Sequence, residues 1–61
     1  MYENYSKLRD ERHLTDYQVA KQTGISTSTL THWKHGRYTP KVYKKKKIAD
    51  LFGVKLEDLI A

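Results

Sequence analysis

The chain of 61 residues is short and basic, with 12 Lys and Arg against 7 Asp and Glu and a formal net charge of +5. The absence of cysteine excludes disulfide bridges and Cys-based zinc sites. No apolar run approaches the length of a membrane span or a signal-peptide core, so we expect a soluble protein. The charge suits a polyanionic partner, most simply a nucleic acid, although a basic soluble domain without such a partner would show the same balance.

The first two predicted helices span residues 3–13 and residues 16–23. Thr15 and Gln18 stand three apart at the start of the second helix, which is the pattern of a capping box. In this motif the threonine hydroxyl accepts from the glutamine backbone amide, and the glutamine side chain reaches back to the threonine amide. Gly24 suits the left-handed residue that ends a helix.

The segment GISTSTLTHWKHG is ambiguous, because its threonines stand at alternate positions as they would in a strand. A strand would place Ser28, Leu30 and His32 on one face, so it would not separate the polar side chains from the apolar ones. A helix of about 100° per residue instead puts Leu30 and Trp33 on one side and the polar side chains on the other. We therefore predict an amphipathic helix over residues 26–35, begun by a serine N-cap and stopped by a glycine.

The last third of the chain predicts two more helices. Thr39 is the expected cap and Pro40 the first residue of a helix over residues 40–52, which Gly53 ends. The segment VKLEDLIA gives a short final helix with a weak cap, because Lys55 stands where Ser or Asp is favoured. No segment shows strand periodicity of any length, so the predicted fold is all-α, a compact domain of five helices.

The residues that these helices turn inward share an apolar character. The predicted core consists of Tyr5, Leu8, Leu14, Val19, Ala20, Ile25, Leu30, Trp33, Ile48, Ala49, Phe52, Val54, Leu56 and Leu59. Trp33 could stack on a base, but its place beside Leu30 on the wheel favours the core. The run YKKKK is interpreted mainly as a solvated helix face, with Lys45 or Lys46 partly over the core and a phosphate contact by Lys44 as the alternative.

The helices at 16–23 and 26–35 form the predicted functional unit. Two short helices joined by a turn of about three residues with a glycine are typical of a helix-turn-helix, whose second helix enters the major groove of DNA. The outward face of this second helix consists of Ser28, Thr31, His32 and His35, with Thr27 beside them. Hydroxyl and imidazole groups can bond base edges, and a threonine methyl can pack on a thymine methyl.

The stretches LTDYQVAKQTGIS, STLTHWKHGRYTP and KIADLFGVKLEDLI resemble the lambda-repressor/Cro-like helix-turn-helix family, also called the XRE family. Its small, turn and buried positions are matched in register by Ala20, Gly24, Ile25, Leu30 and Trp33. The resemblance covers residues 14–60 and implies five helices in one domain, residues 1–61. It also implies a cytoplasmic transcriptional regulator of phage or bacterial type, a repressor that binds double-stranded DNA in sequence-specific fashion, usually as a dimer on a palindromic operator.

The resemblance also implies which residues contact DNA. Base-reading positions are Thr27, Ser28, Thr31 and His32, and positions that touch bases or phosphates are Thr29 and His35. Phosphate positions are Thr15, Tyr17, Arg37, Tyr38 and Lys41, to which Lys34 and Lys44 are added on charge. Asp16 stands where family members often carry a glutamine that holds a phosphate. Since a carboxylate would repel phosphate, Asp16 is interpreted as a first-turn acid that favours the helix dipole.

Two departures from the family pattern affect the expected site. Family members often pair an arginine of the first helix with a glutamate of the third. Arg9 and Lys34 occupy those positions here, so this ion pair cannot form and Lys34 is left to reach the DNA backbone. The recognition helix has no Arg, Gln or Asn, so the strongest bidentate base contacts are missing.

Other readings of the sequence remain open. The same fold could serve an antitoxin-like or accessory protein-interaction module, or an RNA-binding variant. In the final helix, Leu56 and Ile60 form a small apolar patch and are candidate dimer contacts. His32 and His35 lack the further ligands that a metal site needs, although histidine can make binding pH-dependent. The sequence shows no catalytic arrangement, cofactor motif, membrane segment or small-molecule substrate site, so an enzyme is not expected.

Overall fold

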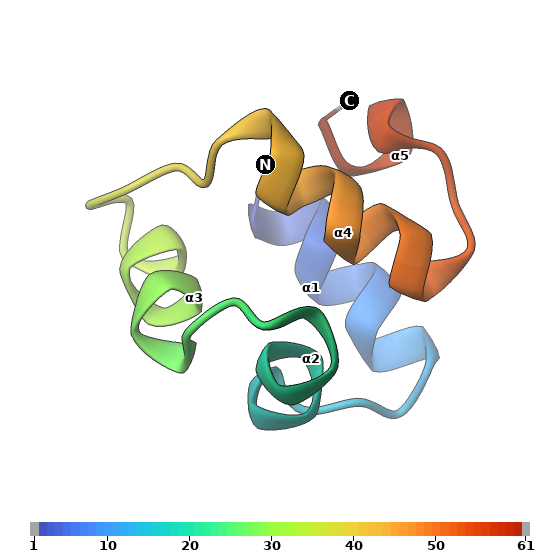
Figure 1. Ribbon diagram of the computed structural model, residues 1–61, viewed down its shortest axis with the longest axis horizontal. Helices are drawn as coiled ribbons and strands as arrows, with labels where there is room; N and C mark the ends of the chain where they lie inside the picture. The colour runs from blue at the N-terminus through green and yellow to red at the C-terminus, as the bar shows by residue number, and fades with distance from the viewer. Residues whose placement is uncertain (1, 61) are drawn as a thin grey trace.

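The computed structural model describes residues 2–60, which form five α-helices and no strand. The helices are α1 (Tyr2–Glu11), α2 (Asp16–Thr23), α3 (Thr27–Lys34), α4 (Val42–Phe52) and α5 (Leu56–Ile60). In Figure 1, α1 and α4 lie in the middle, α2 and α3 lie below and to one side, and α5 lies near the start of α4. The all-α prediction with five helices is confirmed.

The start and end of α2 and the start of α3 are formed by the capping residues that the sequence predicted. The Thr15 hydroxyl accepts from the Gln18 backbone amide at 3.1 Å, and the Gln18 side-chain oxygen Oε1 accepts from the Thr15 backbone amide at 2.8 Å. Gly24 then adopts the left-handed conformation at φ 80°, as predicted. The hydroxyl of Ser26 accepts from the Thr29 amide at 3.1 Å and begins α3. These caps satisfy amides that a helix terminus leaves unpaired.

The predicted boundaries of α1 and α4 were wrong by two residues. The first helix ends at Glu11, and His13 takes a left-handed φ of 55°. The fourth begins at Val42, and its N-cap is Lys41, which makes no side-chain capping bond. Pro40 is fully buried rather than the first residue of the helix. Burying its ring keeps the chain extended to Lys41, so the helix starts later than its proline suggests.

The start of the final helix is capped by a side chain of the same helix. The Lys55 amide donates to the Asp58 carboxylate at 3.1 Å, so an acid three residues along supplies part of the cap that Lys55 cannot. The Asn4 side-chain amide donates to the Leu59 carbonyl at 3.4 Å and joins the start of α1 to the end of α5. None of the helices in residues 2–60 is long and apolar enough to span a membrane.

The core agrees with the prediction at most positions. Fully buried apolar residues are Tyr5, Val19, Ile25, Leu30, Trp33, Ile48, Ala49, Phe52 and Leu59. The expectation that Trp33 belongs to the core is confirmed, since it is 4% exposed. Leu56 is only half-buried. Tyr2, Leu51 and Pro40 were not predicted to pack here, yet the first two lie against the core and Pro40 is buried.

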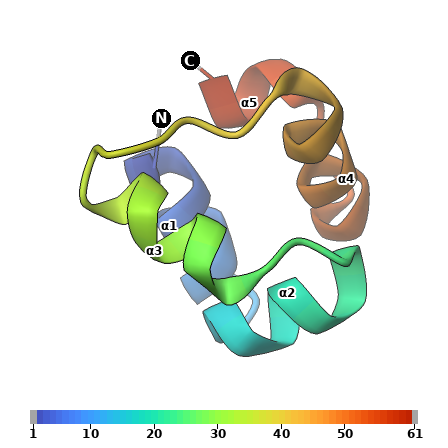
Figure 2. The same ribbon diagram turned by 60° about the vertical axis from the view of Figure 1, so that its left-hand side comes forward.

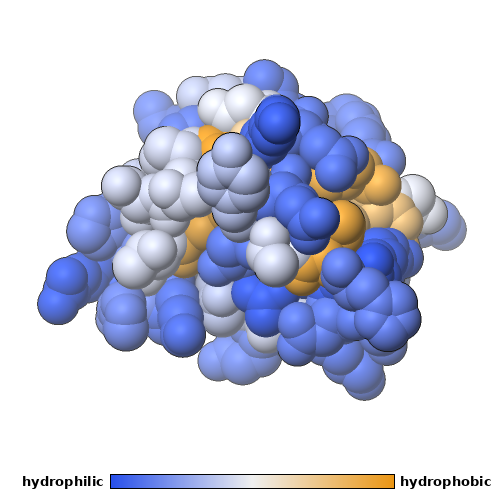
Figure 3. Space-filling view, turned by 90° about the horizontal axis from the view of Figure 1, so that it is seen from below, coloured by the Kyte–Doolittle hydropathy of each residue, from blue (hydrophilic) through white to orange (hydrophobic). Residues whose placement is uncertain are grey.

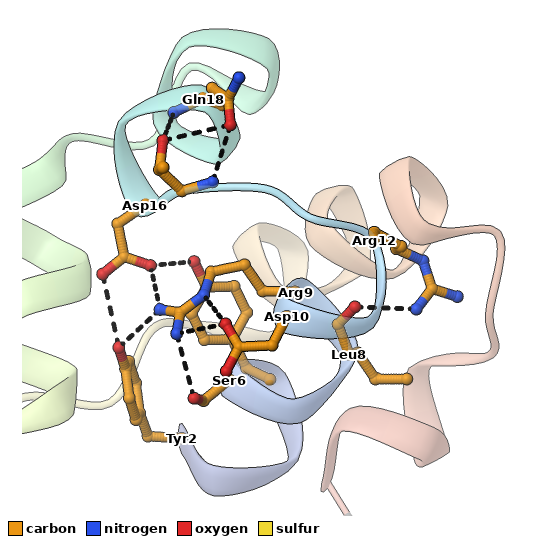
Figure 4. A network of polar contacts seen from close by, with 10 residues as sticks. Tyr2, Ser6, Leu8, Arg9, Asp10, Arg12, Asp16 and Gln18 are labelled. Carbon is orange, nitrogen blue, oxygen red and sulfur yellow. Dashed lines mark hydrogen bonds and ion pairs between the residues drawn. The ribbon is translucent and has the colours of Figure 1, made fainter.

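Arg12 joins the end of α1 to the end of α4. Its guanidinium donates to the Phe52 carbonyl through Nε at 3.1 Å and Nη2 at 2.9 Å, and to the Leu8 carbonyl at 2.9 Å. The same group lies 5.1 Å from the centre of the Phe52 ring. A cation at a helix C-terminus satisfies terminal carbonyls and suits the helix dipole. Figure 4 shows Arg12 directed away from the polar network beside it.

Candidate nucleic-acid interface

The α3 helix is held to the domain by two residues on one face. Leu30 is fully buried and Trp33 is nearly so, and they are the buried residues of this helix. The short connection through Gly24 joins α3 to α2. Figure 2 shows α3 at the surface, with α2 below it and the loop of residues 35–41 running above it. The arrangement is that of a helix-turn-helix, with the second helix accessible along its outer side.

The outer side of α3 is polar and exposed, as the helical wheel predicted. The exposed side chains are Thr27, Ser28, Thr31, His32 and His35. Thr29 differs, because it is half-buried and its hydroxyl lies 2.9 Å from the Ser26 hydroxyl. That hydroxyl is therefore already engaged in the cap. Five short or planar polar side chains thus form a continuous accessible face on one helix.

A shallow hollow lies between α3 and the following loop. It has a volume of about 340 Å³ and is lined by Thr29, His32, Arg37 and Tyr38. The Arg37 amide donates to the His32 carbonyl at 2.9 Å, which fixes the start of the loop against the end of the helix. The Lys44 ammonium lies 5.8 Å from the centre of the Tyr38 ring. Three of the predicted phosphate-binding residues are therefore gathered beside the predicted reading face.

The remaining predicted phosphate residues are accessible at two other places. Thr15 and Tyr17 lie at the start of α2, and Tyr17 is 66% exposed, although the Thr15 hydroxyl already serves the cap. Lys34 and Lys41 are exposed at the end of α3 and just before α4. In the lysine run Lys45 is half-buried, which confirms that one of these side chains lies partly over the core.

Asp16 is a first-turn acid of α2, as expected, and it has a further role that was not predicted. Its Oδ1 accepts from the Arg9 guanidinium at 2.7 Å and from the Tyr5 hydroxyl at 2.6 Å, and its Oδ2 from the Tyr2 hydroxyl at 3.4 Å. It is thus both a first-turn acid of α2 and the ion-pair partner of Arg9. The sequence contained one signal: Lys34 leaves Arg9 without an acid on the third helix, and Asp16 supplies one from the second.

The pKa values of this cluster follow from its burial and its charges. Burial raises the pKa of Tyr5 above its usual value, and the hydrogen bond to Asp16 and the negative charge of Asp16 raise it further. Burial likewise raises the pKa of Tyr2. For Arg9, burial alone would lower the pKa, but hydrogen bonds to Asp16, Asp10 and Tyr2 more than offset it. The network therefore holds one cation, its acids and two neutral phenols.

Charge is segregated along the chain. Residues 17–49 contain eight of the 12 Lys and Arg and none of the 7 Asp and Glu. This stretch begins just after the start of α2 and includes α3, the following loop and most of α4. The acids lie on α1, at the first position of α2, near the end of α4 and on α5. From residue 17 to residue 49, the elements of the candidate interface thus carry basic side chains and no acid.

The molecular surface around the candidate interface is mainly hydrophilic. Figure 3 shows the side that is lowest in Figure 1, where α2 lies, with only small separate apolar areas. On α5, Ile60 is 46% exposed beside the half-buried Leu56, and on α4 Val42 and Tyr43 are more than half exposed. Within residues 2–60, no three His, Asp or Glu side chains come together as a metal site would require.

A short helix pair with a polar accessible face and a basic flank defines a DNA-binding helix-turn-helix domain. Residues 6–59 match the helix-turn-helix family, and the chain belongs to its lambda-repressor/Cro-like (XRE) branch of DNA-binding transcriptional regulators. The resemblance drawn from the sequence is thereby confirmed.

Curated relatives agree with this class. The chain is 40% identical over 47 residues to an HTH-type transcriptional regulator of Methanocaldococcus jannaschii, MJ0272, covering 77% of this chain and 71% of that protein. It is 32% identical over 59 residues to the cryptic phage CTXphi transcriptional repressor RstR of Vibrio cholerae, covering 92% and 53%. The HTH-type transcriptional activator BcrR of Enterococcus faecalis is 29% identical over 59 residues, covering 97% and 29%.

The chain thus spans about half of the repressor and less than a third of the activator. No solved structure gives a significant match. The relatives include one protein named a repressor and one named an activator, so the direction of regulation does not follow from similarity alone.

Proposed function

We propose that this protein regulates transcription by binding double-stranded DNA in sequence-specific fashion, with α3 inserted in the major groove. The observation that carries the proposal is the exposed polar face of α3 beside the basic loop of residues 35–41. An α-helix with its side chains is about 10–12 Å across, which suits the roughly 12 Å width of that groove. The protein acts by binding in the cytoplasm and needs no catalytic group or cofactor.

The proposed base readers are Thr27, Ser28, Thr31 and His32. Their hydroxyl and imidazole groups can donate to or accept from base edges, and their short reach brings the helix backbone close to the groove floor. Thr29 and His35 flank this face and are assigned to base or phosphate contacts. Since bidentate side chains are lacking, each contact should discriminate by less than the ~1–3 kcal/mol of a good bidentate pair.

The proposed phosphate contacts surround the reading face. They are Thr15, Tyr17, Lys34, Arg37, Tyr38, Lys41 and Lys44. Such contacts supply affinity without sequence preference, because they displace condensed counterions from DNA. Binding should therefore weaken as salt rises, with a logarithmic slope of about −0.9 for each phosphate neutralised.

We further propose that the protein is a repressor that occupies its operator as a homodimer. The similarity to RstR supports repression, although BcrR is named an activator. Two-fold operators need two recognition helices about one helical turn of DNA apart, so a dimer is expected. Ile60 and Leu56 are the proposed contact, because Ile60 is an accessible apolar side chain at the end of the described chain.

Selection from a random duplex library tests the proposal. At about 150 mM salt, purely electrostatic binding is weak, so enrichment reports base recognition. We expect an inverted repeat whose half-sites lie about ten base pairs apart. A folded helical protein that enriches no sequence would overturn the proposal and favour the protein-interaction module, which co-purification of a tight partner would then identify.

A further inference from the structure

The orientation of α3 depends on how its single tryptophan is packed. The Trp33 ring meets the Tyr2 ring edge-on, with centroids 5.5 Å apart and planes at 88°. On another side the Tyr5 ring lies 5.2 Å away at 31°. Both tyrosines belong to α1. Because α3 has only Leu30 and Trp33 buried, these two rings limit how far the helix can rotate or tilt.

The hydroxyl groups of those two tyrosines end at one carboxylate. Tyr5 donates to Asp16 at 2.6 Å and Tyr2 at 3.4 Å, and Asp16 is the first residue of α2. Arg9 bonds Asp16 at 2.7 Å and the Tyr2 hydroxyl at 3.1 Å. Figure 4 shows the Asp16 side chain directed from α2 toward α1, where these donors converge. One polar anchor thus connects the start of α2 to the rings that hold Trp33.

The ion pair between Arg9 and Asp16 is largely shielded from solvent, which strengthens it. The Arg9 side chain is 17% exposed and the Asp16 side chain 29% exposed. Charge-assisted hydrogen bonds in such positions are shorter and stronger than neutral ones. Arg9 also bonds Asp10 at 2.8 Å, but the Asp10 side chain is 66% exposed and adjoins Arg9 in the chain. Asp10 therefore pairs with the same arginine without linking α1 to another helix.

We propose that Asp16 and Tyr2 are positioning residues for DNA recognition, acting through Trp33 to set the angle between the start of α2 and the recognition helix. The inference rests on the proposed function, because it requires α3 to read bases. Base contacts need a helix held at one angle, whereas phosphate contacts in solvent tolerate small shifts. Loss of the anchor should therefore reduce sequence-specific affinity and leave non-specific affinity nearly unchanged.

The chain offers a matched pair of variants. Asp16→Asn and Asp10→Asn each remove one acid from Arg9 and raise the net charge by one, so they alter long-range attraction to DNA alike. Affinities are measured for the duplex that the wild type selects and for a scrambled duplex of equal length and composition, corrected for folded fraction. We expect the ratio of selected to scrambled affinity to be about tenfold lower for Asp16→Asn than for Asp10→Asn. The ratio cancels any gain in phosphate binding that follows from removing the carboxylate between Thr15 and Tyr17.

A second readout needs no DNA. The chain has one tryptophan and five tyrosines, and tryptophan absorbs at longer wavelengths than tyrosine. Fluorescence excited at the long-wavelength edge, and the long-wavelength bands of near-ultraviolet circular dichroism, therefore report the packing of Trp33. We expect Asp16→Asn to change both signals in the folded protein and Asp10→Asn to change neither. Should Asp16→Asn fail to fold, Tyr2→Phe keeps the ring and removes only the hydroxyl. We expect that milder variant to lose about threefold in affinity for the selected duplex.

The outcomes separate the two proposals. If the wild type selects no duplex, the proposed function fails, and the Trp33 signals alone decide whether Asp16 holds α3. If Asp16→Asn matches Asp10→Asn in both the affinity ratio and the Trp33 signals, Asp16 is not a positioning residue. A loss of stability in Asp16→Asn with an unchanged affinity ratio would also overturn the inference, since it would show a structural role only.

Discussion

Arg9 lies on α1 and Arg12 just after its end, yet the two side chains stabilise different parts of the molecule by different means. Arg9 pairs with the carboxylate of Asp16 and joins α1 to the helix-turn-helix. Arg12 donates to the carbonyl of Phe52 and joins α1 to the end of α4. The first partner carries a charge and the second does not. Since a charge left unpaired in a partly buried place costs more than an unbonded carbonyl near water, the two contacts should differ in both cost and consequence.

Removing Arg9 should cause the largest loss of stability. In Arg9→Met the Asp16 carboxylate loses its cation while Tyr2 and Tyr5 remain beside it. Breaking a fully buried pair costs about 3–5 kcal/mol, and partial exposure here lowers the expected cost to about 2–4 kcal/mol. Urea unfolding measures it. Adding Asp16→Asn to this variant should recover part of the loss, because no unpaired charge then remains, and an additive result would contradict this reasoning.

Removing Arg12 should cost less and leave recognition alone. Arg12→Met deletes two donors to the Phe52 carbonyl, for an expected loss of about 1–2 kcal/mol in the same unfolding experiment. The Trp33 fluorescence and the ratio of specific to non-specific DNA affinity should stay at the wild-type values, because Arg12 bonds backbone carbonyls and not Asp16 or Tyr2. A loss of specificity comparable with that of Asp16→Asn would erase the distinction between the two arginines.

High pH should destabilise the cluster that Tyr2 and Tyr5 form with Asp16 and Arg9. The pKa values of Tyr2 and Tyr5 lie above the ordinary 10.0 in the folded protein, chiefly through burial. Their contribution to stability is complete below about pH 10 and declines as the pH rises further, by up to about 1.4 kcal/mol per pH unit for each tyrosine. Denaturation series between about pH 8 and pH 11 measure this decline. In Tyr5→Phe it should become shallower, and an equally steep decline would exclude Tyr5 as a source.

Breaking an exposed ion pair should change the free energy of unfolding least, and this variant serves as a reference for the others. The Lys46 ammonium lies 3.7 Å from the Asp50 carboxylate, and both side chains are about two-thirds exposed. Asp50→Asn should change the free energy of unfolding by less than about 0.5 kcal/mol, and added salt should remove the difference. A cost near that of Arg9→Met would mean that burial does not explain the strength of the Arg9–Asp16 contact.

Features that depend on neighbouring residues could be predicted from the sequence. The capping box of Thr15 and Gln18, the serine cap of α3 and the glycine stops of α2 and α4 need only a few consecutive residues, and they were found where expected. The two sides of α3 followed from the helical period alone. Pro40 was misplaced because its local preference for a helix start competes with burial of its ring, and burial depends on residues far along the chain.

The contacts of Asp16 and Arg12 could not be predicted from their neighbours in the sequence. Arg12 reaches a carbonyl 40 residues away, and no side-chain pattern marks a backbone acceptor. For Asp16 there was one signal, because Lys34 stands where the family pattern has a glutamate to pair with Arg9, and another acid must then supply the partner. The tyrosine hydroxyls that complete the cluster depend on how three helices meet. The exposed polar face of α3 could therefore be predicted, whereas the groups that support the helix emerged only from the structure.

The segregation of charge has a consequence for kinetics. With eight cations and no acid in residues 17–49, and all seven acids elsewhere, the molecule has an electric dipole as well as a net charge. A polyanion exerts a torque on such a dipole and turns the positive end toward itself before contact. Encounters with DNA should then begin with α3 and its loop already facing the duplex, and the rate of association should fall steeply as ionic strength shortens the Debye length.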